Sequence, residues 1–432
     1  MILRDPVHGL VAFEGDAGRV VEALIDTREV QRLRRVQQLG LTSLVFPGAE
    51  HSRFAHALGA AHVMVRFLDR IRSVQGELRP EERVDDEAAR DAVAAALVHD
   101  LGHGPFSHLF EDVLPVERHE DWTETILASP ETEIHRALEN LSSGMAARVV
   151  ALLKGTHPIG YLSRAVSGTL DVDRADYLLR DSHMTGASYG LYDLDWIIQS
   201  LTLARIPGED EVVLAVEGRK GLPPVEGFFL GRNFMYQQVY HHKATRAAEI
   251  LVRAIFLRLA EIVREGRAPD PMPAPLRAAA LGDSIDVVEY LSMDDPAVHG
   301  CLAKWEDASD PILADLTRRL RARHLPKTLP LPELEETRWE TARCIASDIV
   351  AKRGMRSDLH VVVDIPSDIP YAEPESIAAT AVWVRIRHEP LRRLGDVSFL
   401  LRQLRNKKIE RPRLIFPAEV RAEVVAAVEG AL

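Results

Sequence analysis

Apolar residues recur at intervals of three and four positions through most of the first part of the chain. This spacing places apolar side chains on one face of a helix. It predicts helices in five representative segments, residues 18–38, 55–71, 85–100, 173–181 and 236–263. A short β-branched segment at residues 211–216 interrupts the pattern and predicts part of a hairpin. The chain therefore begins with a mainly α-helical region.

The helical pattern stops at residues 264–275, where four prolines break any helix. Beyond them, residues 359–365 and 381–386 are rich in β-branched side chains, which predicts strands with helices around them. We therefore expect a mainly α fold, with a helical core over residues 1–265 and a smaller α+β region over residues 266–432. The second region carries no recognisable chemistry, and we expect it to pack on the core or to take part in oligomerisation.

The composition is that of a globular protein. Hydrophobic residues make up 46% of the 432 residues and charged residues 27%. No apolar run approaches the roughly 20 residues of a membrane-spanning helix, and no apolar signal region is found. Cys301 and Cys344 provide neither a disulfide framework nor zinc-finger spacing. These features predict a cytoplasmic protein without membrane association. The formal charge of −12 disfavours nucleic acid as a partner but allows a local basic pocket for a small polyphosphate.

Candidate chemistry concentrates between His51 and His119, which enclose seven of the 17 histidines. The sharpest feature is a run of small apolar residues, 92–98, that leads into His99 and Asp100. This run predicts a buried helix with a His-Asp pair at its end. A buried carboxylate is costly unless a cation receives it, and a metal ion would also bind the imidazole. For an isolated His-Asp pair, the commoner explanation is an aspartate that caps the next helix beside a packed core histidine.

Two other segments shift that balance. His51-Ser-Arg53-Phe-Ala-His56 precedes a predicted helix. In residues 171–181, Asp173, Tyr177 and Asp181 stand at positions i, i+4 and i+8 and form one polar stripe on a helix. The stripe lies beside an apolar flank, which indicates an inward-facing polar surface. The alternative is a solvated helix face held by Asp–Arg pairs.

In their order along the chain, these motifs resemble those of the HD-domain phosphohydrolases. The resemblance is to the branch that contains the sterile-alpha-motif and HD-domain deoxynucleoside triphosphate triphosphohydrolase and its bacterial relatives. The matching segments are Arg4-Asp-Pro-Val-His-Gly9, Gln31-Arg-Leu-Arg34, Gln38-Leu-Gly40, Phe46-Pro-Gly-Ala49, His51-Ser-Arg-Phe-Ala-His56, His99-Asp-Leu-Gly-His-Gly-Pro-Phe-Ser-His108, His119-Glu120, Asp171-Val-Asp173, Gly231-Arg-Asn233 and Tyr240-His-His-Lys243. They span about the first 265 residues, and the ordered set is far more specific than one His-Asp pair.

The resemblance implies a metal centre in which His56, His99, Asp100 and Asp173 bind one divalent ion per chain. Two imidazoles and two carboxylates suit Fe, Mn, Zn, Co or Ni about equally, and Mg also stays open. A second Mg would arrive with the nucleotide. An ion at this centre would lower the pKa of a water molecule and neutralise charge that develops on phosphorus.

The resemblance also implies a set of catalytic and substrate-binding residues. Those beside the scissile phosphate are His103, His108, Glu111 and His119, among which we expect His119 to be the general acid. Those in the substrate pocket are Arg53, Arg174 and Arg232 at the triphosphate, Tyr177 and Asp181 at the deoxyribose, and Gln38, Leu39 and Tyr240 on the other walls. The structural alternatives are helix capping or a surface position for the histidines, surface salt bridges for the arginines, and core packing for Leu39 and the tyrosines.

Regulation and assembly are implied in the same way. The residues that resemble parts of nucleotide-activator sites between subunits are Asp26, Arg34, His242 and Lys243. We therefore expect a homodimer or homotetramer. Trp196 and Gln238 depart from the basic residues expected near those sites.

Three functions are compatible with the sequence. The leading hypothesis is hydrolysis of a deoxynucleoside triphosphate to the deoxynucleoside and tripolyphosphate. One alternative is an enzyme that removes phosphates stepwise from a nucleotide or a nucleotide analogue. The other is a nucleotide-sensing protein that binds without turnover.

Overall fold

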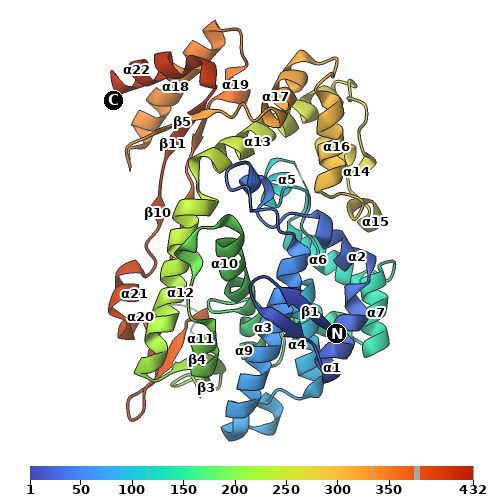
Figure 1. Cartoon of the computed structure of the whole chain (residues 1–432), viewed down its shortest axis with the longest axis vertical. Coiled ribbons are helices and arrows are strands. Elements are labelled where there is room, and N and C mark those ends of the chain that lie inside the picture. The colour runs from blue at the N-terminus through green and yellow to red at the C-terminus, as the bar shows by residue number, and fades with distance from the viewer. Residues whose placement is uncertain (115, 334, 374–379, 432) are drawn as a thin grey trace.

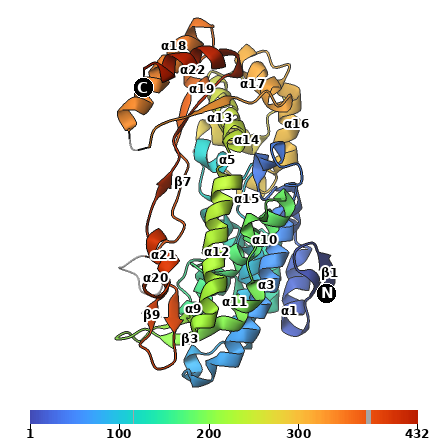
Figure 2. The ribbon, with the colours of Figure 1, turned by 60° about the vertical axis from the view of Figure 1, so that its left-hand side comes forward.

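The computed structural model describes residues 1–114, 116–333, 335–373 and 380–431, with every side chain in these ranges except that of His108. Helices dominate, which confirms the predicted mainly α fold, and the strands form only small sheets of two to four strands. The molecule is elongated, and the C-terminal part of the chain runs along one side of the helical body (Figures 1 and 2). Among the described residues, no helix is both long and apolar enough to cross a membrane.

The helical body is built from short helices around a few long ones. Its helices are α1 (Gly15–Ile25), α2 (Arg28–Arg32), α3 (Arg53–Val74), α4 (Asp86–Val98), α5 (His108–Val113), α6 (His119–Ala128), α7 (Glu133–Leu141), α8 (Met145–Leu153), α9 (Gly160–Val166), α10 (Val172–Thr185), α11 (Leu194–Ser200), α12 (Leu222–Met235) and α13 (Lys243–Arg264). The predicted helices at residues 55–71, 85–100 and 173–181 appear as α3, α4 and α10. Residues 92–98 of α4 are buried, as their small apolar side chains predicted.

Two predicted helices are interrupted where side chains cap the backbone. The segment 18–38 breaks after α1, because the Thr27 hydroxyl and the Gln31 amide donate to terminal carbonyls of that helix, at 2.7 and 2.8 Å. The segment 236–263 begins with a π-helical turn at Tyr236–Tyr240. It then restarts as α13, where the His242 ring accepts a hydrogen bond from the Ala244 N–H at 3.2 Å. Periodicity alone does not reveal such caps.

The strands connect distant parts of the chain. They are β1 (Ile2–Asp5), β2 (Gly9–Ala12), β3 (Leu201–Arg205), β4 (Val212–Glu217), β5 (Lys327–Pro330), β6 (Val362–Asp364), β7 (Ser367–Asp368), β8 (Trp383–Arg385), β9 (Arg392–Arg393), β10 (Ile409–Glu410) and β11 (Arg413–Phe416). The β1–β2 and β3–β4 pairs are antiparallel, and β8 adds to β4 in parallel. The predicted strands at 211–216 and 381–386 therefore exist. The segment 359–365 is a strand only from Val362, because its start completes α19 (Ser357–His360).

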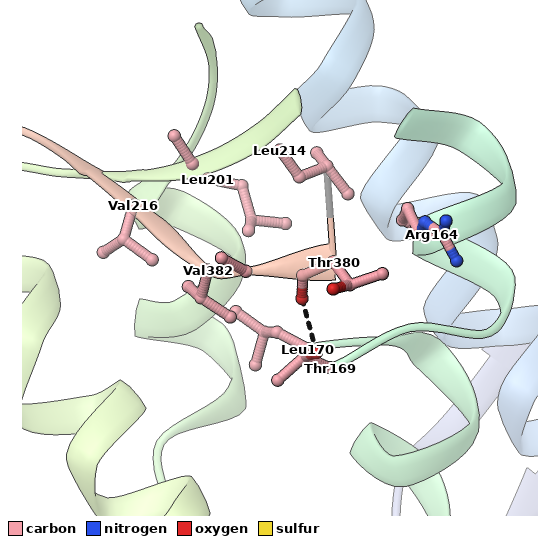
Figure 3. Close-up of a pocket in the computed structure, with 10 residues that line it drawn as sticks. Arg164, Thr169, Leu170, Leu201, Leu214, Val216, Thr380 and Val382 are labelled. Carbon is pink, nitrogen blue, oxygen red and sulfur yellow. Dashed lines mark hydrogen bonds between the residues drawn. The ribbon is translucent and has the colours of Figure 1, made fainter. Parts of the chain in front are cut away.

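The junction of β8 with the β3–β4 hairpin is shown in Figure 3. The Thr169 hydroxyl donates to the Thr380 carbonyl at 2.7 Å, and Leu201, Val216 and Val382 pack around a cavity of about 30 Å³. This space is about that of one water molecule, which is far too small for a nucleotide.

The remaining helices follow the proline-rich segment. They are α14 (Ala274–Leu281), α15 (Val287–Tyr290), α16 (Asp295–Trp305), α17 (Pro311–Arg321), α18 (Glu336–Lys352), α19, α20 (Leu394–Val397), α21 (Phe399–Leu404) and α22 (Arg421–Glu429). Both α14 and α17 pack on α13, and Leu276, Trp305 and Leu313 join the main hydrophobic cluster of the body. A separate small core lies between α18, α22 and β11. The division at residue 265 stays a prediction.

Candidate metal centre and substrate cavity

The four predicted metal ligands come together from three helices. His56 lies in the first turn of α3, His99 and Asp100 follow α4, and Asp173 lies in the first turn of α10. The Nε2 atom of His56 is 3.2 Å from Nε2 of His99 and 3.1 Å from Oδ1 of Asp173. The Nε2 atom of His99 is 3.4 Å from Oδ1 of Asp100 and 3.6 Å from Oδ1 of Asp173. Neighbouring ligands of an ion with bonds of about 2.0–2.2 Å stand roughly 3–3.5 Å apart. His56, His99 and Asp100 form a group that could hold one ion, and Asp173 lies at similar distances from both imidazoles.

The hydrogen bonds of the two histidines prepare them for a cation. The Nδ1 atom of His56 lies 2.8 Å from the Asp176 carboxylate, and Nδ1 of His99 lies 2.9 Å from the Ala96 carbonyl. Both partners only accept hydrogen bonds, so each Nδ1 carries a hydrogen and each Nε2 directs a lone pair to the centre. Two lone pairs at 3.2 Å repel each other unless a proton or a metal ion lies between them.

Charge at the centre supports the same assignment. Burial by itself would lower the pKa of His56, but the carboxylates of Asp173 and Asp176 outweigh burial and raise this pKa to about 10. Burial would raise the pKa of Asp173, yet His56 and His99 lower it overall. Without a metal ion, the excess of carboxylates therefore retains a proton on imidazole. Metal binding must displace that proton, so metal affinity should fall as the pH is lowered.

A cavity of about 470 Å³ opens on this centre. The predicted site residues that line it are Gln38, Leu39, Arg53, Asp100, His103, His119, Asp173, Tyr177, Asp181 and Tyr240. Its lining is thus drawn from segments that lie as far apart in the sequence as Gln38 and Tyr240. The volume lies within the range of about 300–1,000 Å³ that is usual for small-molecule sites.

A second cavity of about 220 Å³ approaches the centre from another side. Its lining includes His99, Glu120 and Lys154. Asp100, His119 and Asp173 line both cavities. These three residues therefore form the partition between the two spaces.

The predicted general acid is held by a carboxylate. His119 is the first residue of α6, and its Nδ1 atom is 2.9 Å from an oxygen of Glu111, which also accepts the His119 backbone N–H at 2.6 Å. A carboxylate that accepts a hydrogen bond from Nδ1 orients the ring. The His119 ring stacks on that of His103, with the ring centres 3.9 Å apart. Burial and the charge of Arg53 lower the pKa of His103 well below its ordinary value, so His103 is the weaker candidate for the acid.

The other predicted catalytic and triphosphate residues differ in position. The side chain of His108 lies outside the described residues. Arg53 lines the large cavity and forms an ion pair with Asp100. Arg174 pairs with Asp171, and Arg232 pairs with Asp368 at 2.8 Å and donates to the Ile369 carbonyl at 2.9 Å. Neither Arg174 nor Arg232 is among the residues that line the large cavity.

The predicted sugar residues are fixed by their own contacts. Asp181 accepts hydrogen bonds from His51 Nε2 at 2.8 Å and from the Tyr240 hydroxyl at 2.6 Å. The rings of Tyr177 and Tyr240 meet edge to face, with centres 6.3 Å apart. The stripe predicted on one helix therefore faces the cavity along α10, with Asp173 at the metal end and Asp181 two turns further on.

The four residues assigned to activator sites lie at the surface or near it. Asp26, Arg34 and Lys243 are exposed, and His242 is partly buried. The Arg34 guanidinium lies 3.6 Å from the centre of the Phe54 ring, and the His242 ring packs edge to face on Phe46. Their role between subunits stays a prediction.

Sequence reasoning missed several residues that surround the centre. Asp176 and His8 lie within motifs that were noticed, but nothing in the sequence pairs positions 168 residues apart. Arg246 and Glu249, which line the large cavity from α13, belong to a polar helix face that is indistinguishable from a solvated one. Only the tertiary fold brings these side chains to the site.

Glu249 gives the cavity wall a pH dependence. Its side chain is 22% exposed, and burial, partly offset by Arg246 and reinforced by Asp364 and Asp112, raises its pKa from 4.5 to about 7. The unfolded chain releases this proton near pH 4.5 and the folded chain near pH 7. Between these values the folded state binds more protons, so stability falls as the pH rises, by roughly 3 kcal/mol at most.

Glu249→Gln removes this proton. The melting temperature of the variant relative to the wild type should therefore rise between pH 5 and pH 8, as thermal unfolding at a series of pH values would measure. Glu289→Gln, the same change at an exposed position on α15, is the control. Parallel curves of melting temperature against pH for Glu249→Gln and the wild type would contradict the raised pKa.

The chain is similar in sequence and in structure to known proteins that contain an HD domain or are phosphohydrolases. A family model described as an HD domain matches residues 53–181, which include all four predicted ligands. The chain is 33% identical to the uncharacterized protein YwfO of Bacillus subtilis, over 97% of this chain and 92% of that protein. It is 28% identical to human deoxynucleoside triphosphate triphosphohydrolase SAMHD1, over 77% of this chain and 56% of that protein. A solved phosphohydrolase from Bacteroides thetaiotaomicron matches with a TM-score of 0.79 at 26% identity, over 96% of this chain and 99% of that one.

Proposed function

Because the chain belongs to the HD-domain phosphohydrolases, we propose that it hydrolyses deoxynucleoside triphosphates to deoxynucleosides and tripolyphosphate. One observation carries the proposal: two of the four candidate ligands, Asp100 and Asp173, line one cavity of about 470 Å³ together with Tyr177 and Asp181 of the α10 stripe. The likeness to SAMHD1, which is a deoxynucleoside triphosphate triphosphohydrolase, supports it.

The residues of the centre divide the chemistry among them. His56, His99, Asp100 and Asp173 would hold the divalent ion, which when bound activates the attacking water and offsets negative charge on the phosphate. His119, held at Nδ1 by Glu111, is placed to give a proton to the departing oxygen through its other ring nitrogen. Arg53, at the cavity wall beside Asp100, adds positive charge where a phosphate would lie.

Selection of the sugar follows from the stripe on α10. With the phosphate end fixed near Asp173, the sugar lies against Tyr177 and its 3′-hydroxyl against Asp181. A ribose 2′-hydroxyl pressed on the Tyr177 ring would lose water without gaining a partner, at a cost of roughly 1–3 kcal/mol. Deoxynucleotides should therefore react faster than ribonucleotides by about one to two orders of magnitude in kcat/KM.

The test compares dGTP with GTP and separates the products. Metal-loaded protein should release tripolyphosphate and deoxyguanosine from dGTP, and Tyr177→Ala should reduce the preference for dGTP at least several-fold by opening space for the 2′-hydroxyl. Tyr189→Ala, at a tyrosine that is 51% exposed and outside the lining of the cavity, is the matched control. Equal kcat/KM for dGTP and GTP in the wild-type protein would contradict the proposed fit of the sugar.

One observation favours the stepwise phosphatase as a second candidate. Arg174 and Arg232, which were expected at the triphosphate, are held in ion pairs and do not line the large cavity. A site with fewer phosphate contacts would accept tri-, di- and monophosphates alike. Orthophosphate released in turn from dGTP, dGDP and dGMP would establish this candidate, whereas tripolyphosphate as the only phosphorus product would exclude it.

A further inference from the structure

A buried carboxylate links the candidate metal ligand His56 to the N-terminal hairpin. The side chain of Asp176, which is fully buried, accepts from His56 Nδ1 at 2.8 Å and contacts His8 Nε2 at 2.7 Å. It also accepts two hydrogen bonds from Arg180, at 2.8 and 2.9 Å. The His8 side chain is only 4% exposed. One carboxylate therefore contacts a candidate ligand, the turn that follows β1, and its own helix α10.

The turn itself is shaped by a second carboxylate of the same network. Asp5 ends β1, and its Oδ1 atom accepts the backbone N–H groups of Val7 at 2.8 Å and His8 at 2.9 Å. Its other oxygen accepts from Arg180 Nη1 at 2.8 Å. Arg180, which is fully buried, thus bridges the two carboxylates. The segment Asp5-Pro-Val-His8, part of a motif noticed in the sequence, is tied to the centre at both ends.

Helix α3 is built to receive this network. Gly59 lies three residues after His56, and a Cβ atom at Gly59 would lie 1.9 Å from Oδ1 of Asp176 and 2.3 Å from Nη2 of Arg180. No side chain other than hydrogen fits there without displacing the carboxylate. The Asp176–Arg180 contact therefore requires glycine at position 59, and this steric evidence is separate from the hydrogen bonds.

We propose that Asp176 is a positioning residue for His56, and that the β1–β2 hairpin, through His8 and Asp5, is a structural part of the metal centre. The inference rests on the proposed role of His56 as a metal ligand. Asp176 fixes the tautomer and the direction of the His56 ring, and the hairpin fixes Asp176. By thermodynamic linkage, metal binding must then stabilise the hairpin as much as the hairpin favours metal binding.

The first test measures metal affinity, with Co²⁺ alone as the probe. His8→Gln and Asp176→Asn should bind Co²⁺ about 10- to 100-fold more weakly than the wild type, the range typical for loss of a residue that orients a metal ligand. The visible spectrum of bound Co²⁺ should change, because the geometry of the His56 ligand changes. Gly59→Ala should act in the same direction by displacing Asp176. His135→Gln, at a histidine of α7 that bonds to the Leu127 carbonyl and lines neither cavity, is the control and should leave both readouts unchanged.

The second test measures amide hydrogen exchange over residues 1–13 with and without Co²⁺. In the wild type, Co²⁺ should slow exchange in the hairpin, and in His8→Gln this protection should be lost even at saturating Co²⁺. Because His8→Gln leaves the Asp176–Arg180 contacts in place, it keeps the proposal testable if Asp176→Asn fails to fold. The proposal would be overturned if His8→Gln had the Co²⁺ affinity and the Co²⁺ spectrum of the wild type. It would also be overturned if Co²⁺ did not change amide exchange in the wild-type hairpin. Neither readout uses a nucleotide, so absence of dNTP hydrolysis would refute the proposed function and leave this inference standing.

Discussion

Asp100→Ala is expected to abolish hydrolysis and to lower bound metal below one ion per chain. Asp100 is 7% exposed and lies within reach of His99, His103 and Arg53, so its loss removes a charged ligand and leaves its partners poorly compensated. Since loss of an orienting residue alone weakens binding by about 10- to 100-fold, loss of a ligand should exceed about 100-fold. Metal content after dialysis and initial rates with dGTP would measure both effects.

The control for this experiment is Asp121→Ala, the same change at an exposed position on α6. His99→Ala and Asp173→Ala should behave like Asp100→Ala, because each removes one of the converging donors. A full metal complement in all three variants would refute the assignment of the centre.

His119→Ala is expected to reduce turnover by about 10²- to 10⁴-fold while metal content stays at the wild-type level. That range is typical for the loss of a general acid. His119 lines the cavity but does not belong to the four converging donors, so chemistry and metal binding should separate in this variant. Single-turnover rates and metal analysis on the same preparation would measure the separation.

Glu111→Gln should reproduce part of this loss, because the His119 ring would lose the carboxylate at Nδ1 that holds its orientation. His135→Ala, at a histidine outside both cavities, is the control for loss of an imidazole. If His119→Ala turns over at the wild-type rate, His119 has a structural role only.

The elements that carry the candidate ligands could be predicted because their signals are local. The small apolar run before His99 is buried in α4, and the Asp173, Tyr177 and Asp181 spacing places the three side chains on one face of α10 whatever the tertiary fold. The order of the motifs, through the family resemblance, then indicated that His56 joins His99, Asp100 and Asp173. Local periodicity was thus sufficient for the parts of the site that lie on single helices.

The rest depended on contacts between distant segments. The breaks after residue 25 and before α13 are made by side-chain caps, which periodicity does not contain. The pairing of His8 with Asp176 joins the first turn of the chain to its central helix. The ion pair of Arg232 with Asp368 arises only because a C-terminal strand lies against α12. In each case the sequence offers several chemically equivalent partners, and only the tertiary structure determines which of them makes the contact.

Helix α13 belongs to the cavity and to the interior at the same time. Glu249 and Arg253 face the cavity from one side of the helix, while other positions pack on α14 and α17, and Arg258 pairs with Asp310 at the start of α17. Close-packed interiors transmit displacement rather than absorb it. A mutation near Trp305 or Leu313, remote from every reacting atom, can therefore move the wall that a substrate touches. The part of the chain beyond α13 can therefore change the shape of the candidate site without contributing a residue to its chemistry.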